Sequence, residues 1–198
     1  NEYRLMINGL VDREMIFSLD DLKRFPQTNK FYFLECAANG GMEWRGAQLN
    51  GCQFTFGMIH NVQYTGVKLS DIVKETGIKP SAKWLLAEGG DSAGLSRSIP
   101  IEKALDDCMI AWAMNGEDIP LQNGFPLRLV CSGWPGSVSG KWLNRLVVRN
   151  QVHDGEKMAA PSYSVPQTHV APGSRVPNED MKVMESMPVK SIVTFPQS

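Results

Sequence analysis

Apolar runs alternate with turn-forming residues from residue 3 to residue 150, which is typical of many short strands with few helices. Residues 3–11 predict the start of a hairpin, because Asn8 and Gly9 suit the positive φ angles of a tight turn. Residues 30–37 are aromatic and apolar, which predicts a strand that Asn39, Gly40 and Gly41 then break. The same reasoning predicts strands at residues 83–87, 109–114, 126–131 and 142–148.

Three short helices interrupt these strands. Ser18 followed by Asp21 offers a capping pair that opens a helix over residues 18–25. The other two are expected over residues 69–76, closed by Gly77, and over residues 100–107. The pattern indicates an α+β fold with mixed β-sheets and short peripheral helices.

The texture changes beyond Gln151, where Pro, Ser and Met become frequent until residues 189–195 resume strand character. We expect roughly 35 residues there to wrap the surface, a length unusual for a structureless loop and therefore a candidate functional segment.

The chain of 198 residues is 42% hydrophobic, which excludes a disordered chain. Its formal net charge is −1, so the protein as a whole does not attract nucleic acid electrostatically. No apolar run approaches the ~20 residues of a membrane span, and no basic segment leads into an apolar one at the start. The chain begins at Asn1 rather than at Met, which leaves the cellular compartment open.

Charge is unevenly distributed although its sum is near zero. Residues 119–153 contain no Asp or Glu but include four basic side chains. Two of them, Arg128 and Lys141, flank a loop rich in Gly and Ser, which predicts an anion site. Arg145 and Arg149 are expected to be solvated surface charges. A nucleotide-binding P-loop does not fit, because Pro135 and Trp142 stand where that motif needs Gly and Ser or Thr.

Four cysteines without a C-x-x-C pair argue against a structural zinc site. We interpret Cys52, Cys108 and Cys131 as small buried apolar residues. Cys36 differs because it stands where a strand runs into a glycine loop. Such a thiol can be buried, act as a nucleophile beside a histidine, or bind a soft metal, and the residues alone leave these alternatives open.

Seven blocks occur in the order seen in the sulfite oxidase family of molybdenum enzymes, and the chain resembles that family over about residues 3–196. They are LECAANGG at 34–41, YTGVKL at 64–69, EGGD at 88–91, RSIP at 97–100, AWAMNG at 111–116, GFPLRLV at 124–130 and KWL at 141–143. The stretch over residues 35–52 resembles the molybdenum subunits of bacterial sulfane dehydrogenases.

The resemblance implies a sulfite-oxidase-like fold that binds molybdenum and molybdopterin. It makes Cys36 the metal ligand, in keeping with the softness of a thiolate. The implied cofactor-binding residues are Cys36, Asn39, Asp91, Arg97, Ser98, Arg128 and Lys141, and the implied catalytic residues are Tyr163, Arg45 and Arg97.

The implied reaction is oxygen-atom transfer to a sulfur species, sulfane or sulfite, with electrons passing to a c-type cytochrome. The resemblance further implies a periplasmic protein, a sulfur-carrier protein as substrate carrier and a homo-oligomer in the full-length form. In sulfite oxidases a sulfite-binding arginine stands at the position of Gly40, so we expect a larger sulfur substrate here.

We expect residues 1–198 to form a single molybdopterin-binding domain without the family's upstream pterin segment and downstream immunoglobulin-like dimerisation domain. Two other hypotheses remain. One is a truncated or cofactor-poor relative that acts as a non-catalytic binding module. The other is a cysteine-dependent hydrolase with His153 as its base.

Overall fold

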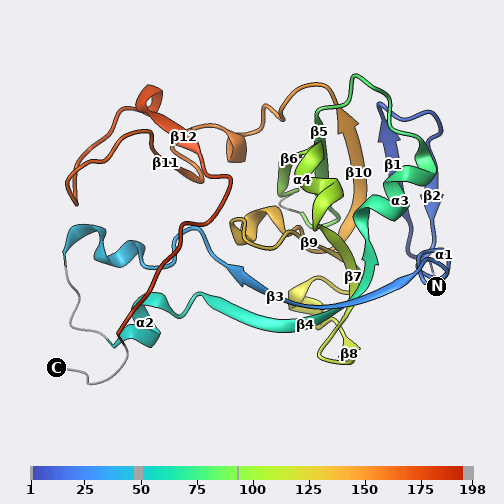
Figure 1. The fold of residues 1–198 in the computed structure, drawn as a ribbon, viewed down its shortest axis with the longest axis horizontal. Coiled ribbons are helices and arrows are strands. Elements are labelled where there is room, and N and C mark those ends of the chain that lie inside the picture. The colour runs from blue at the N-terminus through green and yellow to red at the C-terminus, as the bar shows by residue number, and fades with distance from the viewer. Residues whose placement is uncertain (1, 47–50, 93, 194–198) are drawn as a thin grey trace.

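The computed structural model describes residues 2–46, 51–92 and 94–193. In this part of the chain, two five-stranded sheets and one two-stranded sheet form the framework (Figure 1). The first sheet has the strand order β2 (Met15–Phe17), β1 (Leu5–Gly9), β10 (Leu143–Arg149), β5 (Trp84–Gly89) and β6 (Ser96–Pro100). Strands β1 and β10 run parallel and the other pairs are antiparallel, so the sheet is mixed, as predicted.

The second sheet is antiparallel. Its order is β3 (Gln27–Glu35), β4 (Ile59–Lys68), β7 (Met109–Met114) and β8 (Glu117–Asp118), with β9 (Arg128–Val130) pairing to β7. The small third sheet joins β11 (Ser164–Pro166) to β12 (Met181–Val183). Strand β3 therefore lies at an edge of the second sheet, which leaves one of its sides available to other segments.

The helices are short and peripheral: α1 (Leu19–Leu22), α2 (Cys52–Phe56), α3 (Leu69–Thr76) and α4 (Ile101–Asp106). The predicted capping pair is confirmed, because the Ser18 hydroxyl accepts from the Asp21 N–H while the Asp21 carboxylate accepts from the Ser18 N–H. Helix α3 ends at Gly77 as predicted. Single turns of 3-10 helix cover Gly41–Arg45, Leu121–Asn123, Gly136–Val138, Glu156–Met158 and Asn178–Asp180. No helix of the described segments is long and apolar enough to cross a membrane.

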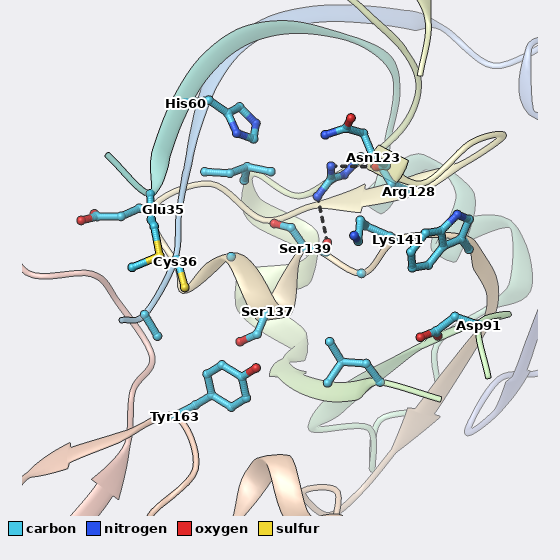
Figure 2. A pocket seen from close by; sticks show the side chains of 17 residues that line it. Glu35, Cys36, His60, Asp91, Asn123, Arg128, Ser137, Ser139, Lys141 and Tyr163 are labelled. Carbon is cyan, nitrogen blue, oxygen red and sulfur yellow. Dashed lines mark hydrogen bonds between the residues drawn. The ribbon is translucent and has the colours of Figure 1, made fainter. Parts of the chain in front are cut away.

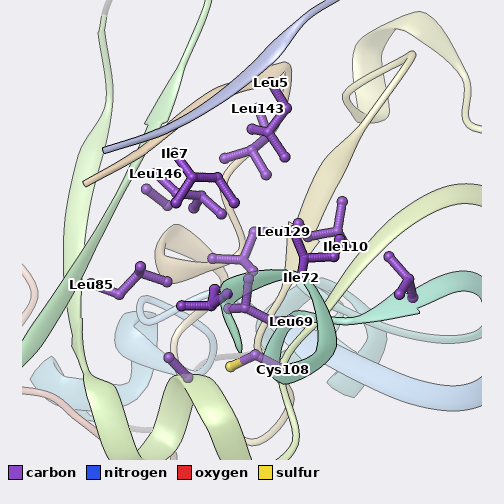
Figure 3. Packing of buried hydrophobic residues seen from close by; sticks show 14 of the residues in the cluster. Leu5, Ile7, Leu69, Ile72, Leu85, Cys108, Ile110, Leu129, Leu143 and Leu146 are labelled. Carbon is purple, nitrogen blue, oxygen red and sulfur yellow. The ribbon is translucent and has the colours of Figure 1, made fainter. Parts of the chain in front are cut away.

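The main core lies where the first sheet meets α3 and the strands β7 and β9 (Figure 3). Strand alternation explains its composition. In β1, Leu5 and Ile7 point inward, and in β7, Ile110 joins this core while Met109 and Ala111 join a second cluster on the opposite face. Because β7 is buried on both faces, the second sheet is fixed to the first through it.

Two sequence predictions differ from the structure. Asn8 and Gly9 continue β1 beside β10, and the hairpin turn lies after them. Gly9 has φ +94°, and a Cβ there would stand 2.3 Å from the Val148 carbonyl oxygen. The absence of a side chain therefore allows β1 and β10 to lie this close together. The strand expected over residues 189–195 is wrong for residues 189–193, which are irregular, and residues 194–195 lie outside the described residues. An apolar run forms a strand only where another strand lies beside it and can pair with its backbone.

Sequence analysis also missed several elements, namely α2, β4, β6, β8, β11 and β12. Strand β4 escaped notice because its first half is polar and exposed. Beyond residue 151 the chain does wrap the surface, but it contains the β11–β12 pair. Its last described part then crosses the end of β3 (Figure 1, red).

Candidate functional site

Cys36 follows directly after β3 and is exposed, which excludes the buried alternative that the sequence left open. It lines a cavity of about 370 Å³ (Figure 2). The opposite side of the cavity comes from the loop between β9 and β10, which contributes Gly136, Ser137, Ser139, Gly140 and Lys141. The thiol and the acid-free segment, distant in sequence, therefore share one site.

A close backbone contact brings these two segments together. Glu35 forms an isolated parallel bridge with Pro135. A Cβ at Gly136 would lie 3.2 Å from the Glu35 carbonyl oxygen, so glycine permits this approach. The Cys36 N–H donates to the Met58 carbonyl at 2.9 Å, which fixes the start of the thiol loop.

Arg128, the first residue of β9, lines the cavity although it is only 4% exposed. Its Nη1 donates to the Asn123 carbonyl at 2.9 Å and its Nη2 to the Ser139 carbonyl at 3.0 Å. Burial lowers the pKa of Arg128 below its ordinary value, and Tyr64, 5.8 Å away by its ring centre, opposes this shift. The buried Nε of Arg128 has no hydrogen-bond partner among the described residues, so one donor of this cation remains to be satisfied.

Lys141 lies exposed at the rim of the same cavity. Its Nζ donates to the Gln122 carbonyl at 3.0 Å and stands 4.5 Å from the centre of the Trp142 ring. Arg128 and Lys141 thus meet as predicted. Their environments differ, because one cation is enclosed and the other faces solvent.

Tyr163 lines the cavity on the side of the C-terminal segment, and Arg97 supports it from β6. The Arg97 guanidinium lies 4.7 Å from the centre of the Tyr163 ring, and its Nη1 donates to the Ser137 hydroxyl at 3.2 Å. Arg97 is 3% exposed, and its Nε also lacks a partner within the described ranges. Burial lowers the pKa of Arg97, and Tyr163 opposes the shift.

His60 and Asn123 line the cavity too, and sequence reasoning assigned neither to the site from its own chemistry. The His60 Nε2 and the Tyr64 hydroxyl share a hydrogen bond of 2.9 Å. Burial lowers the pKa of His60, and the charge of Arg128 lowers it further. The signal in the sequence was the spacing of His60 and Tyr64, four residues apart and so on one face of a strand.

The structure places the remaining predicted residues as follows. Asp91 lines the cavity. Asn39 does not, because its side chain bridges the Glu35 carboxylate at 2.9 Å and the Met58 N–H at 3.1 Å. Ser98 is buried, and its hydroxyl accepts from the His153 N–H at 2.9 Å. The side chain of Arg45 lies outside the described residues.

Gly40, where sulfite oxidases carry an arginine, is not among the residues that line the cavity. It has φ +78°, and a Cβ there would stand 2.5 Å from Phe56 Cε1. A side chain at this position would therefore start against an aromatic ring in a strained backbone conformation. The geometry gives no support to the expectation that Gly40 widens the cavity.

The site joins one soft donor to a cationic, hydroxyl-bearing wall. No group of three or more His, Cys, Asp or Glu that could hold a metal ion gathers anywhere in the described ranges, and Cys36 is the thiol among the residues that line the cavity. A metal held at this place would need further ligands from a cofactor. The unpartnered Nε of Arg128 and the Ser137 hydroxyl suit an anionic part of such a cofactor. Arg97 does not line the cavity itself and contacts Ser137 and Tyr163, which do.

Comparisons with known proteins agree with this chemistry. The family described as oxidoreductase molybdopterin binding domain matches residues 1–157. The mitochondrial sulfite oxidase of Drosophila melanogaster is 32% identical over 162 residues, which are 77% of this chain and 28% of that protein. The NADH nitrate reductase of Ulva prolifera is 30% identical over 164 residues, 75% of this chain and 19% of that protein.

A solved structure is similar over nearly the whole chain. The sulfane dehydrogenase SoxCD from Paracoccus pantotrophus matches with a TM-score of 0.86 and 43% identity, covering 98% of this chain and 48% of that one. The chain therefore spans less than a third of the two curated relatives and about half of the SoxCD chain.

Proposed function

The chain belongs to the oxidoreductase molybdopterin-binding domain family, which includes the sulfite oxidases, and from this premise we propose that it serves in an enzyme that oxidises a sulfur species by oxygen-atom transfer. The two candidate substrates are sulfane and sulfite. The 43% identity to a sulfane dehydrogenase supports the sulfane alternative, whereas the identity to sulfite oxidases is 32% in Drosophila melanogaster.

The observation that carries the proposal is that an exposed thiol, Cys36, and a buried guanidinium with an unsatisfied donor, Arg128, line the same cavity. Cys36 supplies the soft ligand that a sulfur-coordinated metal requires. The Nε of Arg128 is buried and without a hydrogen-bond partner in the described structure. An anionic pterin cofactor would satisfy a donor that is otherwise costly to bury.

Each residue then has a distinct role. Cys36 would bind the metal, and Arg128, Lys141 and the Ser137 hydroxyl would hold the anionic part of the cofactor. Arg97 would position the Tyr163 ring, and the Tyr163 hydroxyl would contact substrate. When bound, the molybdenum cofactor supplies a two-electron redox centre that can pass an oxygen atom, and the protein orients and tunes it.

Partners and compartment follow the same proposal. We place a c-type cytochrome as electron acceptor, a sulfur-carrier protein as donor of sulfane and the periplasm as location. The similarity to SoxCD supports the cytochrome as partner. Steady-state assays with a carrier-bound sulfane and with free sulfite would separate the two substrate classes, and low-micromolar use of sulfite without any response to sulfane would reject the sulfane alternative.

The hydrolase hypothesis loses support from the position of its base. His153 does not line the cavity. Its N–H donates to Ser98, and its ring lies beside Arg149 with 3.4 Å between Nδ1 and Nη1. The histidine that does reach the cavity, His60, is hydrogen-bonded to Tyr64. The non-catalytic module hypothesis is decided by metal content.

The test is the molybdenum and pterin content of protein from cells that make the cofactor. We expect equimolar molybdenum in the parent and in the control Cys52→Ser, and loss of molybdenum or of sulfur-oxidising activity in Cys36→Ser. Circular dichroism would verify the fold of each variant. Molybdenum-free parent protein would favour the binding module, and a fully active Cys36→Ser would refute the assignment of the ligand.

A further inference from the structure

Cys108 and Cys131 flank a pair of antiparallel strands, because Cys108 directly precedes β7 and Cys131 directly follows β9. Strands β7 and β9 are antiparallel with Met109 opposite Val130, so one step outward places Cys108 opposite Cys131. The two cysteines are 3% and 0% exposed and belong to the same core cluster. Figure 3 shows Cys108 in this core beside Leu69. The Cys108 thiol donates to the Lys103 carbonyl at 3.4 Å, and the neighbouring Cys131 thiol raises the pKa of Cys108.

Backbone hydrogen bonds show which kind of antiparallel pair this is. The Cys108 carbonyl accepts from the Leu69 N–H at 3.0 Å, and the Cys131 N–H donates to the Ser139 hydroxyl at 3.0 Å. Both groups therefore point away from the facing strand, so the pair is of the non-hydrogen-bonded type. Cα atoms in such pairs are about 4.5 Å apart, within the ~4.4–6.8 Å that a disulfide spans.

We propose that Cys108 and Cys131 are a covalent modification site, at which an intramolecular disulfide ties β7 to β9. Two thiols lose two protons and two electrons and form one S–S bond. The electrons pass to the disulfide of an oxidant, either a thioredoxin-fold dithiol oxidase or a small-molecule disulfide, which breaks into two thiols. Both cysteines are free thiols in this structure, which is therefore the reduced form.

The surroundings decide when the bond forms. Burial and the neighbouring thiol hold the Cys108 pKa far above its ordinary value, so the closed core reacts slowly. Lys103 faces the pair, with its Nζ bonded to the Ser132 carbonyl at 3.1 Å and to Asp107 at 2.6 Å, and its charge favours a thiolate while Asp107 opposes one. The bond thus forms before the core closes or during its local opening.

The consequence concerns the strand that carries Arg128. Strand β9 begins at Arg128 and leads through Cys131 into the loop that lines the cavity. A disulfide at its end would hold this strand against β7 and close a loop over residues 108–131. We expect the melting temperature to rise by roughly 5–10 °C on oxidation. The inference does not depend on the proposed activity.

Peptide mapping of the full chain tests the proposal. The protein is equilibrated with glutathione buffers of stepwise ratio in urea just below its unfolding transition, starting from fully reduced and from oxidised samples. After acid quenching and alkylation in denaturant, trypsin leaves the four cysteines in separate peptides, residues 31–45, 46–68, 104–128 and 129–141. We expect a linked pair of peptides 104–128 and 129–141, with Cys36 and Cys52 alkylated.

Other results would overturn the proposal. These are alkylation of both peptides under the most oxidising buffer, separate glutathione adducts on them, or linkage of either one to Cys36 or Cys52. Melting supplies a second measurement. The oxidised parent should melt above the reduced parent, and the double variant Cys108→Ala, Cys131→Ala should melt at one temperature in both buffers. An equal redox shift in that variant would assign the effect to other thiols.

Discussion

The cationic wall of the cavity, residues 128–141, is anchored in the core, whereas the thiol wall, residues 35–41, stands at the edge of the second sheet. In the cationic wall, Arg128, Cys131 and Ser139 are buried, and the Arg128 guanidinium ties two loop carbonyls together. In the thiol wall, Cys36 is exposed. Among the side chains that hold it is Glu35, which bonds to Asn39 and Lys190.

This difference separates two tasks. The hydrogen-bond donors of the cationic wall are held in place before any ligand binds, so these side chains lose little conformational entropy when an anion binds. An exposed thiol on an edge loop can meet a metal and its other ligands without disturbing the core. Substitutions in the cationic wall should therefore change folding as well as binding, whereas substitutions in the thiol wall should change binding alone. The following predictions, all for cofactor-free protein, test this contrast.

The largest effect should come from Arg128→Gln. It removes two charge-assisted hydrogen bonds worth about 1.5–3 kcal/mol each and leaves the Asn123 and Ser139 carbonyls unpaired, so we expect the free energy of unfolding to fall by roughly 3–5 kcal/mol. Urea denaturation measures this loss. The control Lys141→Gln changes an exposed cation of the same wall and should cost less than about 1 kcal/mol. If Arg128→Gln and Lys141→Gln lowered the free energy of unfolding equally, the buried Arg128 would contribute no more to folding than the exposed Lys141, and the contrast would be wrong.

Lys190→Met should have the next largest effect, because it removes the tether between the C-terminal segment and the thiol wall. Glu35 is buried, but Lys190 is 30% exposed and Glu35 keeps its bond to Asn39, so the expected loss is about 1–2 kcal/mol. Hydrogen exchange should quicken over residues 36–41. The exposed Lys182→Met on β12 is the matched control. Unchanged exchange in Lys190→Met would show that the tether does not hold the thiol wall.

The sequence predicted the elements around the core better than those of the segment beyond residue 151. Local signals were sufficient for α3, β7 and the capping pair of α1, since each is specified by its own residues. The acid-free segment also indicated Arg128 and Lys141, which both line the cavity, and their binding of an anion stays a prediction. In contrast, β11 and β12 are three residues each and depend on each other across a long connection, which no local pattern reveals.

Site residues beyond the motifs escaped for a similar reason. His60 reaches the cavity because β4 pairs with β3 in a register that places it opposite Leu34, a pairing that no local motif reports. Asn39 belongs to the motif but turns toward Glu35. Motif membership thus indicates a neighbourhood, and the direction of each side chain depends on packing that only the structure shows.

A smaller effect should appear in the pH dependence of stability through His60, which lies between the two walls. Burial and Arg128 hold its folded pKa below the ordinary value of 6.5, so the unfolded chain binds a proton that the folded chain resists. Stability should therefore fall as the pH drops from about 6.5 toward the folded pKa. His60→Gln should weaken this fall in thermal melts, while the exposed His169→Gln should not. Identical pH profiles for His60→Gln and the parent would refute it.

The smallest effect on folding should come from the substitution that empties the site. Cys36 is exposed, and the hydrogen bonds found for it are those of its backbone, so Cys36→Ser should change the free energy of unfolding by less than about 0.5 kcal/mol. Cys131→Ser, directly after β9 in the cationic wall, instead places a hydroxyl in the core and should cost roughly 1–3 kcal/mol. Urea titrations of the two variants under reducing conditions measure the difference. If Cys36→Ser proved as destabilising as Cys131→Ser, the thiol wall would be part of the folded core, and loss of metal from Cys36→Ser could no longer be attributed to loss of a ligand.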